Sequence, residues 1–115
     1  MTLQELTRSI ASFSAERDWG QFHSPKNLAM ALSVEASEIV ELFQWRAEAE
    51  SRVLEDATRE AVADEIADVL IYLVRLADEL GIDPLLAAER KMLKNAAKYP
   101  ADKVRGRTDK YSEYE

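Results

Sequence analysis

The placement of glycine and proline constrains the fold of this chain more than any other feature. The 115 residues include only three of each, and they stand where helices should start or stop. Between them, apolar residues recur at intervals of three and four, which is the period of an α-helix, and no β-type alternation is found. Because proline and glycine disfavour helix interiors, the uninterrupted segments predict an all-α chain.

Start and stop signals predict four main helices. Thr2 begins a capping-box pattern, Ser24 and Asp83 each precede a proline at a first helical position, and Gly81 follows a helix end. The expected helices are residues 3–17, 25–47, 56–80 and 84–98, with a loop at 18–24 and a polar turn at 48–55.

The two long helices are joined by a short turn, so we expect them to pack antiparallel. Between Val69 and Leu76 the third helix is apolar nearly all the way round, which predicts burial on more than one side. A chain of this size has too few helices to cover that surface. We therefore expect a bundle of four main helices that is completed by homo-oligomerisation, with one domain over residues 1–100 and a polar tail over 101–115.

The composition excludes several functions. A net charge of −7 argues against coating nucleic acid. No segment has the ~20 apolar residues of a membrane span, and the first residues show no signal-peptide pattern; we expect a cytoplasmic protein. Cysteine is absent, which rules out disulfides and thiolate metal sites. Basic residues gather in 90–110, where they could serve a phosphorylated ligand or form an ordinary solvated helix end.

Two pairs of carboxylates interrupt the apolar faces of the long helices. Glu35 and Glu38 lie in SVEASEIVELFQW, and Glu65 and Asp68 lie in DEIADVLIYLV. Residues three apart share one face of a helix, about one turn from each other. If the two helices pack through these faces, four carboxylates converge on one place.

Converging carboxylates need either protons or a cation. Unpaired buried charges cost several kcal/mol each, and like charges repel. No Lys or Arg lies on those faces near the pairs. An all-oxygen site suits Mg²⁺ first and Mn²⁺ second, whereas a di-iron bundle needs two Glu-x-x-His motifs and the sole histidine, His23, is in a loop. A single ExxE is usually a solvated face, and from the residues alone both explanations stay open.

Four longer segments, together with the acid pairs, resemble a known family. They resemble the MazG-like, all-α nucleoside triphosphate pyrophosphohydrolases, and most closely the dCTP pyrophosphatase branch. The segments are RDWGQFHSPKNLAMAL at 17–32, ELFQW at 41–45, DEIADVLIYLVRLA at 64–77 and KMLKNAAKYP at 91–100.

The resemblance implies an enzyme. Its reaction would be Mg²⁺-dependent cleavage of dCTP, or a related pyrimidine deoxynucleoside triphosphate, to the monophosphate and pyrophosphate. The biological task would be nucleotide-pool sanitation or balance. The enzyme would be a homotetramer or a dimer. Glu35, Glu38, Glu65 and Asp68 match the family's metal ligands, and Glu38 or Glu35 would also orient or deprotonate the attacking water.

The resemblance also implies a set of substrate-binding residues. Of the first three, the two tryptophans would enclose the base, and the histidine would contact the ligand or support the loop. One further residue would lie by the sugar, and three on one face of the fourth helix would reach phosphate or sugar. Without the resemblance, the tryptophans would be interpreted as loop or interface packing and Lys91 as a surface lysine. The first three residues are Trp19, His23 and Trp45, the residue by the sugar is Tyr72, and the three of the fourth helix are Lys91, Asn95 and Tyr99. Lys110 and Tyr111 also resemble a late pair in the branch.

The sequence is also compatible with two other functions. One is a broad-specificity MazG-like nucleoside triphosphate pyrophosphatase. The other is a non-catalytic helical module that binds a nucleotide or a partner. The second carboxylate pair discriminates between catalysis and binding, because acids without metal repel a triphosphate.

Overall fold

The computed structural model describes residues 1–108, and this part of the chain contains helices and no strand. The prediction of an all-α protein is confirmed for it. In chain order the elements are α1 (Leu3–Glu16), the 3₁₀ helix η1 (Trp19–Phe22), α2 (Pro25–Phe43), α3 (Glu48–Ser51), α4 (Asp56–Glu79), α5 (Pro84–Lys98) and α6 (Ala101–Val104).

The capping residues predicted from the sequence begin three of the four main helices, α1, α2 and α5. The Thr2 hydroxyl accepts from the Glu5 N–H at 3.1 Å, and the Ser24 hydroxyl accepts from the Asn27 N–H at 3.1 Å. Asp83 caps α5 by accepting from two backbone N–H groups. Gly81 ends α4 with φ of +66°, a left-handed conformation that glycine adopts without steric cost.

The second helix ends at Phe43, four residues before the predicted boundary. Arg46 explains the difference, because its guanidinium bonds to Glu55 at 3.1 Å and to Thr58 at 3.2 Å. These contacts draw the chain toward the start of α4. The polar turn that follows contains the one-turn helix α3, in which the Glu50 carboxylate accepts from the Ala47 N–H at 3.0 Å.

Two other short helices lie where irregular chain was expected. The loop after α1 contains η1, which begins after Asp18 in the left-handed region at φ of 53°; aspartate tolerates this conformation better than most residues. The single turn of α6 follows Pro100. Such short helices have too few residues for a recognisable period.

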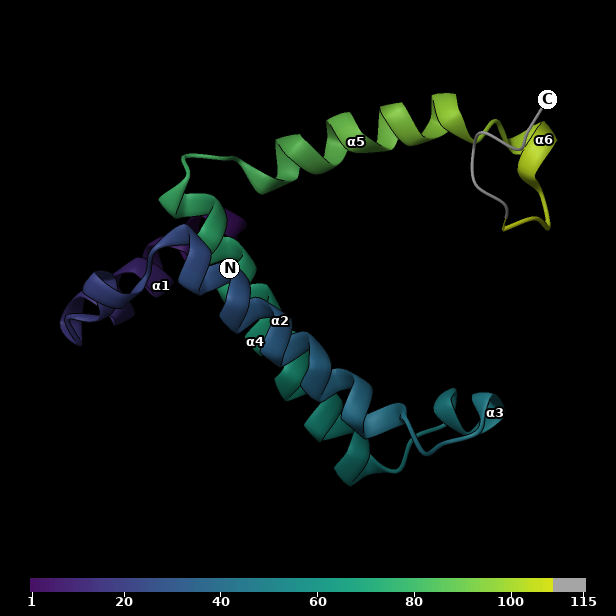
Figure 1. Ribbon diagram of the computed structural model, residues 1–115, viewed down its shortest axis with the longest axis horizontal. Helices are drawn as coiled ribbons and strands as arrows, with labels where there is room; N and C mark the ends of the chain where they lie inside the picture. The colour runs from purple at the N-terminus through teal and green to yellow at the C-terminus, as the bar shows by residue number, and fades with distance from the viewer. Residues whose placement is uncertain (109–115) are drawn as a thin grey trace. The chain divides into compact units, whose positions relative to one another are not determined.

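Residues 1–81 form one compact unit built on the α2–α4 pair. These two helices run side by side in opposite directions (Figure 1), as predicted, and α1 packs against α4. The core is small. Its buried apolar side chains are Ile10, Leu28, Val62, Val74 and Ala77.

Residues from Ile82 onward form a second unit, which contains α5 and α6 and is described by itself. Lys110, Tyr111 and the rest of the tail from 109 lie outside the described residues. The division into a domain over 1–100 and a tail over 101–115 stays a prediction. Within the part of the chain described, no helix is long and apolar enough to cross a membrane.

Candidate active site

Three carboxylates meet where α2 packs on α4. Glu35 and Glu38 come from successive turns of α2, and Glu65 comes from α4. One carboxylate oxygen of each lies within 4.8 Å of the other two, and all three side chains are half-buried. The antiparallel packing therefore brings three of the four acids together, whereas the spacing predicted that all four converge.

Asp68 stands slightly apart from this cluster. It lies one turn beyond Glu65 on α4 and is half-buried, but it does not belong to the close group of three. Its charge nevertheless contributes to raising the pKa of Glu35. Asp68 also lines the neighbouring pocket, so it borders both features.

The cluster is electrostatically strained. The pKa of Glu65 is raised to about 7, first by its side-chain contact with the Glu38 carboxylate, then by burial and by Glu35. Burial is the largest cause of the raised pKa of Glu35, followed by Glu38, while the contact with Glu65 partly opposes the shift. Like charges and desolvation both disfavour a second ionised carboxylate in such a place.

Two carboxylate oxygens in the cluster have no hydrogen-bond partner among the described residues. Glu35 Oε2 and Glu65 Oε2 are buried and accept no hydrogen bond from the described residues. A buried acceptor without a partner costs free energy, and a cation between the helices would satisfy both oxygens. The donors are all carboxylate oxygens, which suits a hard divalent ion. The residues present therefore fit a metal site.

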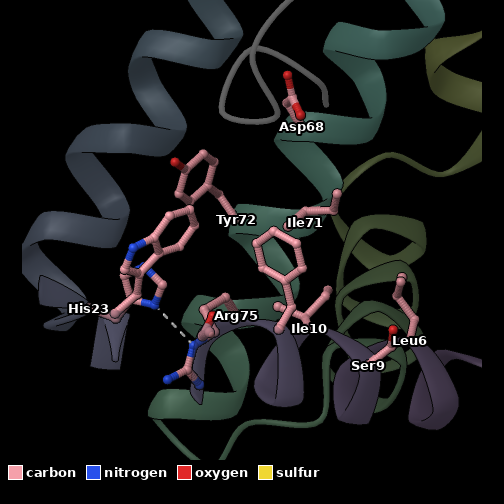
Figure 2. A pocket seen from close by; sticks show the side chains of 11 residues that line it. Leu6, Ser9, Ile10, His23, Asp68, Ile71, Tyr72 and Arg75 are labelled. Atoms are coloured by element: carbon pink, nitrogen blue, oxygen red, sulfur yellow. Dashed lines mark hydrogen bonds between the residues drawn. The ribbon is translucent and has the colours of Figure 1, made fainter. Parts of the chain in front are cut away.

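A pocket of about 350 Å³ adjoins the cluster. Figure 2 shows Asp68 and Arg75 at opposite ends of its α4 wall, with Ile71 and Tyr72 between them. Helix α1 and the segment around η1 form the other walls. The lining residues are Leu6, Ser9, Ile10, Phe13, Ser14, Trp19, His23, Asp68, Ile71, Tyr72 and Arg75.

Aromatic rings line one side of the pocket. Phe13 and Trp19 meet edge to face, with ring centroids 5.6 Å apart at 69°, and Trp19 meets His23 at 6.4 Å and 66°. The Trp19 side chain keeps 43% exposure, so its ring is accessible to a ligand. The structure thus gathers Trp19, His23, Tyr72 and Asp68 around one pocket, and their contact with substrate stays a prediction.

Trp45 is a predicted substrate residue that does not line this pocket. Trp45 is 90% exposed and follows α2 beside Arg46, which bonds to Thr58. At 1.5 Å per residue, Thr58 is about 20 Å along α4 from Tyr72, so Trp45 does not line this chain's pocket. Lys91, Asn95 and Tyr99 belong to α5 and its C-cap in the second unit; their role stays a prediction.

Arg75 is the pocket residue that sequence reasoning missed most clearly. No basic residue was expected near the acid pairs, yet Arg75 shares a pocket with Asp68. Its guanidinium contacts Asp78 at 3.3 Å and Glu79 at 3.1 Å. The signal was its position seven residues after Asp68, which places both on one face of α4. Phe13 and Ile71 also line the pocket, and as apolar residues at helical spacing they carry no signal that distinguishes a pocket wall from a core face.

The chain is similar in sequence and in fold to known proteins. A model of the MazG-like family matches residues 30–114. Two similar proteins are called dCTP pyrophosphatase 1: that of Homo sapiens is 46% identical and that of Rattus norvegicus 44% identical, each over 114 residues covering 97% of this chain and 67% of the relative. A pyrophosphatase structure from Archaeoglobus fulgidus DSM 4304 is 44% identical, with a TM-score of 0.80 over 84% of this chain and 91% of that one.

Proposed function

This chain belongs to the MazG-like family, and from that premise we propose that it is a Mg²⁺-dependent nucleotide pyrophosphohydrolase. It hydrolyses dCTP, or a related pyrimidine deoxynucleoside triphosphate, to the monophosphate and pyrophosphate. The identity with proteins named dCTP pyrophosphatase 1 supports the substrate class. We place the enzyme in the cytoplasm, where it would remove unwanted nucleotides or balance the pool.

The carboxylate cluster is the observation that carries this proposal. Three acids whose oxygens lie within 4.8 Å of one another, with two of their oxygens buried and unbonded, form a strained arrangement for a protein that only binds a triphosphate. Without metal, these acids would repel a ligand of the same sign. A metal-dependent reaction at phosphate would explain why the three carboxylates lie together.

The acids have distinct tasks in this reaction. Glu35, Glu38, Glu65 and Asp68 would hold the metal, and Mg²⁺ would supply positive charge to offset that of the triphosphate and polarise the phosphoryl group. The carboxylate of Glu38 or Glu35 orients the attacking water and accepts its proton. Positioning of water and phosphate by fixed side chains accounts for much of catalysis in phosphoryl-type transfers.

The aromatic pocket receives the nucleoside. Trp19 and His23 contact the base, and Tyr72, one turn beyond Asp68 on α4, lies by the sugar. This assignment is supported by the position of Asp68, which borders both the pocket and the acid cluster. A nucleotide with its base in the pocket would therefore direct its phosphates toward the acids. Lys91, Asn95 and Tyr99 bind phosphate or sugar in this proposal.

The active unit is a homo-oligomer, a tetramer or a dimer. Ile66, Leu70 and Leu73 form an apolar row on α4, and they remain 54%, 43% and 44% exposed in the single chain. Burying such side chains contributes about 1.5–3 kcal/mol each. A second copy would cover this row, and it would also allow Trp45 to reach the pocket of a neighbouring subunit.

Product analysis tests the function directly. Ribo- and deoxynucleoside triphosphates are incubated with the protein in Mg²⁺, in Mn²⁺ or in chelator, and the products are separated by chromatography. We expect metal-dependent formation of dCMP and pyrophosphate, with little product from purine nucleotides. Equal activity on every nucleotide would refute the dCTP preference and leave a broad-specificity enzyme. No product from any nucleotide would refute catalysis and favour a binding module.

A further inference from the structure

His23 and Arg75 form a polar contact at the end of the pocket remote from the acids. Arg75 Nε donates to His23 Nδ1 at 3.3 Å, across 52 residues of sequence (Figure 2). The arginine side chain is only 13% exposed, and its two terminal nitrogens contact Asp78 and Glu79 of the same helix. These ion pairs one turn along α4 hold the guanidinium fork in place.

This hydrogen bond decides where the imidazole proton lies. A ring nitrogen that accepts a hydrogen bond carries no proton, so a neutral His23 bonded in this way is protonated on Nε2. Burial and the Arg75 charge lower the pKa of His23 below its ordinary 6.5, with Glu79 opposing. The charged groups that act on the ring are thus Arg75 and Glu79, Asp78 contacts the guanidinium of Arg75, and Trp19 meets the ring edge to face.

We propose that Arg75 is a positioning residue, which fixes His23 in the Nε2–H form as a neutral hydrogen-bond donor to the base of the nucleotide. The inference deepens the proposed function and rests on it for the identity of the ligand. A cytosine ring offers two acceptors, O2 and N3, to a neutral N–H donor. Arg75 itself need not touch the nucleotide, because its nitrogens are already engaged by His23, Asp78 and Glu79.

The tautomer can be measured without any nucleotide. Because His23 is the sole histidine, ¹⁵N-histidine labelling gives one unambiguous pair of ring nitrogens in long-range ¹H–¹⁵N NMR spectra. We expect an unprotonated Nδ1 and a protonated Nε2 in the wild type at pH 7.5. Arg75→Met should mix the tautomers and raise the histidine pKa, whereas Arg59→Met, an exposed position on the same helix, should change neither. A protonated Nδ1 in the wild type, or an unchanged spectrum in Arg75→Met, would overturn the proposal.

Substitution by lysine separates charge from hydrogen-bond geometry. Arg75→Lys keeps a positive charge near the ring but lacks the planar guanidinium that bonds to Nδ1. We expect its histidine pKa to stay close to that of the wild type while the preference for the Nε2–H tautomer weakens. If Arg75→Lys retained the full tautomer preference, the charge alone would be sufficient and the positioning role would be wrong.

Kinetics then test whether the tautomer matters for substrate. Arg75→Met should raise the KM for dCTP about 3- to 10-fold, the range for one neutral hydrogen bond, and leave kcat within about twofold. In a His23→Ala background, Arg75→Met should add nothing, because Arg75 acts through His23. An additive effect in the double variant would overturn the proposal. If the wild type hydrolyses no nucleotide, the proposed function fails, while the NMR result still decides the tautomer.

Discussion

At the scale of single residues, the carboxylates of the cluster differ in burial and in pKa, and these differences bear on the role of each. Glu35 and Glu65 each have a buried oxygen without a hydrogen bond, and both have a raised pKa. They are the residues whose charge the site can least tolerate without a cation. Glu38 faces both of them and is the one whose contact contributes most to the shift of Glu65.

Replacing Glu38 by glutamine should remove turnover and preserve the fold. The change keeps the side-chain volume and relieves repulsion, so helical circular dichroism should be unchanged and the melting temperature equal or higher. Loss of a ligand that also accepts a proton should reduce kcat by at least about 100-fold. Glu41→Gln, an exposed position on the same helix, is the matched control. Near-normal turnover in Glu38→Gln would remove Glu38 from the catalytic residues.

Replacing Trp19 by alanine should weaken nucleotide binding. A ring stacked on a base contributes about 1–3 kcal/mol, so the KM for dCTP should rise at least about fivefold while kcat falls less. Phe22→Ala is a suitable control, because Phe22 is in the same 3₁₀ helix, is 60% exposed and does not line the pocket. Equal KM values in the two variants would exclude Trp19 from base contact.

At the scale of elements, the α2–α4 pair couples folding to protons and metal. A carboxyl whose pKa is raised on folding stabilises the folded state while it is protonated, and this contribution is lost as the pH rises toward the folded pKa. For Glu65 that window extends from its ordinary 4.5 to about 7. A metal ion held by the same oxygens would compete with the proton for them.

The melting temperature in chelator should therefore fall as the pH rises from about 5 to about 7.5. Glu65→Gln should flatten this dependence, whereas Glu60→Gln, an exposed position on α4, should not. Millimolar Mg²⁺ should raise the melting temperature of the wild type at pH 7.5 and have less effect at pH 5.5. Differential scanning fluorimetry measures both. A melting temperature unmoved by Mg²⁺ at pH 7.5 would count against the metal site.

At the scale of the whole molecule, the single chain leaves large apolar side chains exposed. The buried core of residues 1–81 consists of few side chains, and the apolar row on α4 is exposed. Trp45 is 90% exposed and does not line the pocket of its own chain. Both facts favour an assembly of copies in which the surface is covered and the pocket is completed.

Introducing a charge into the apolar row should dissociate that assembly. Leu70→Glu would place a carboxylate in an apolar contact, and the mass measured by sedimentation velocity should fall toward 13.0 kDa. Arg59→Glu, an exposed polar position on α4, should leave the mass unchanged. A wild-type protein that sediments as a monomer would refute the oligomer outright.

Mixed oligomers test whether Trp45 acts across subunits. Trp45→Ala should raise the KM for dCTP, and Glu38→Gln should be inactive. When the two variants are co-expressed, some sites combine intact acids from one copy with Trp45 from the other, so activity with a normal KM should reappear. Failure to recover any such activity would place Trp45 outside the neighbouring subunit's site. An unchanged KM in Trp45→Ala alone would remove it from base contact altogether.

The sequence by itself determined the four main helices and the acid pairs, but not the short helices η1, α3 and α6. Caps such as Thr2, Ser24 and Asp83 act on backbone groups within three residues, and a spacing of three places two acids on one face, so both are readable locally. Family membership was also readable, because it depends on residues in order. Only the tertiary structure decided that Glu65 approaches the α2 acids more closely than Asp68 does, that Trp45 is remote from the pocket, and that Arg75 bonds to His23. Those contacts depend on how helices distant in sequence pack, which no local pattern specifies.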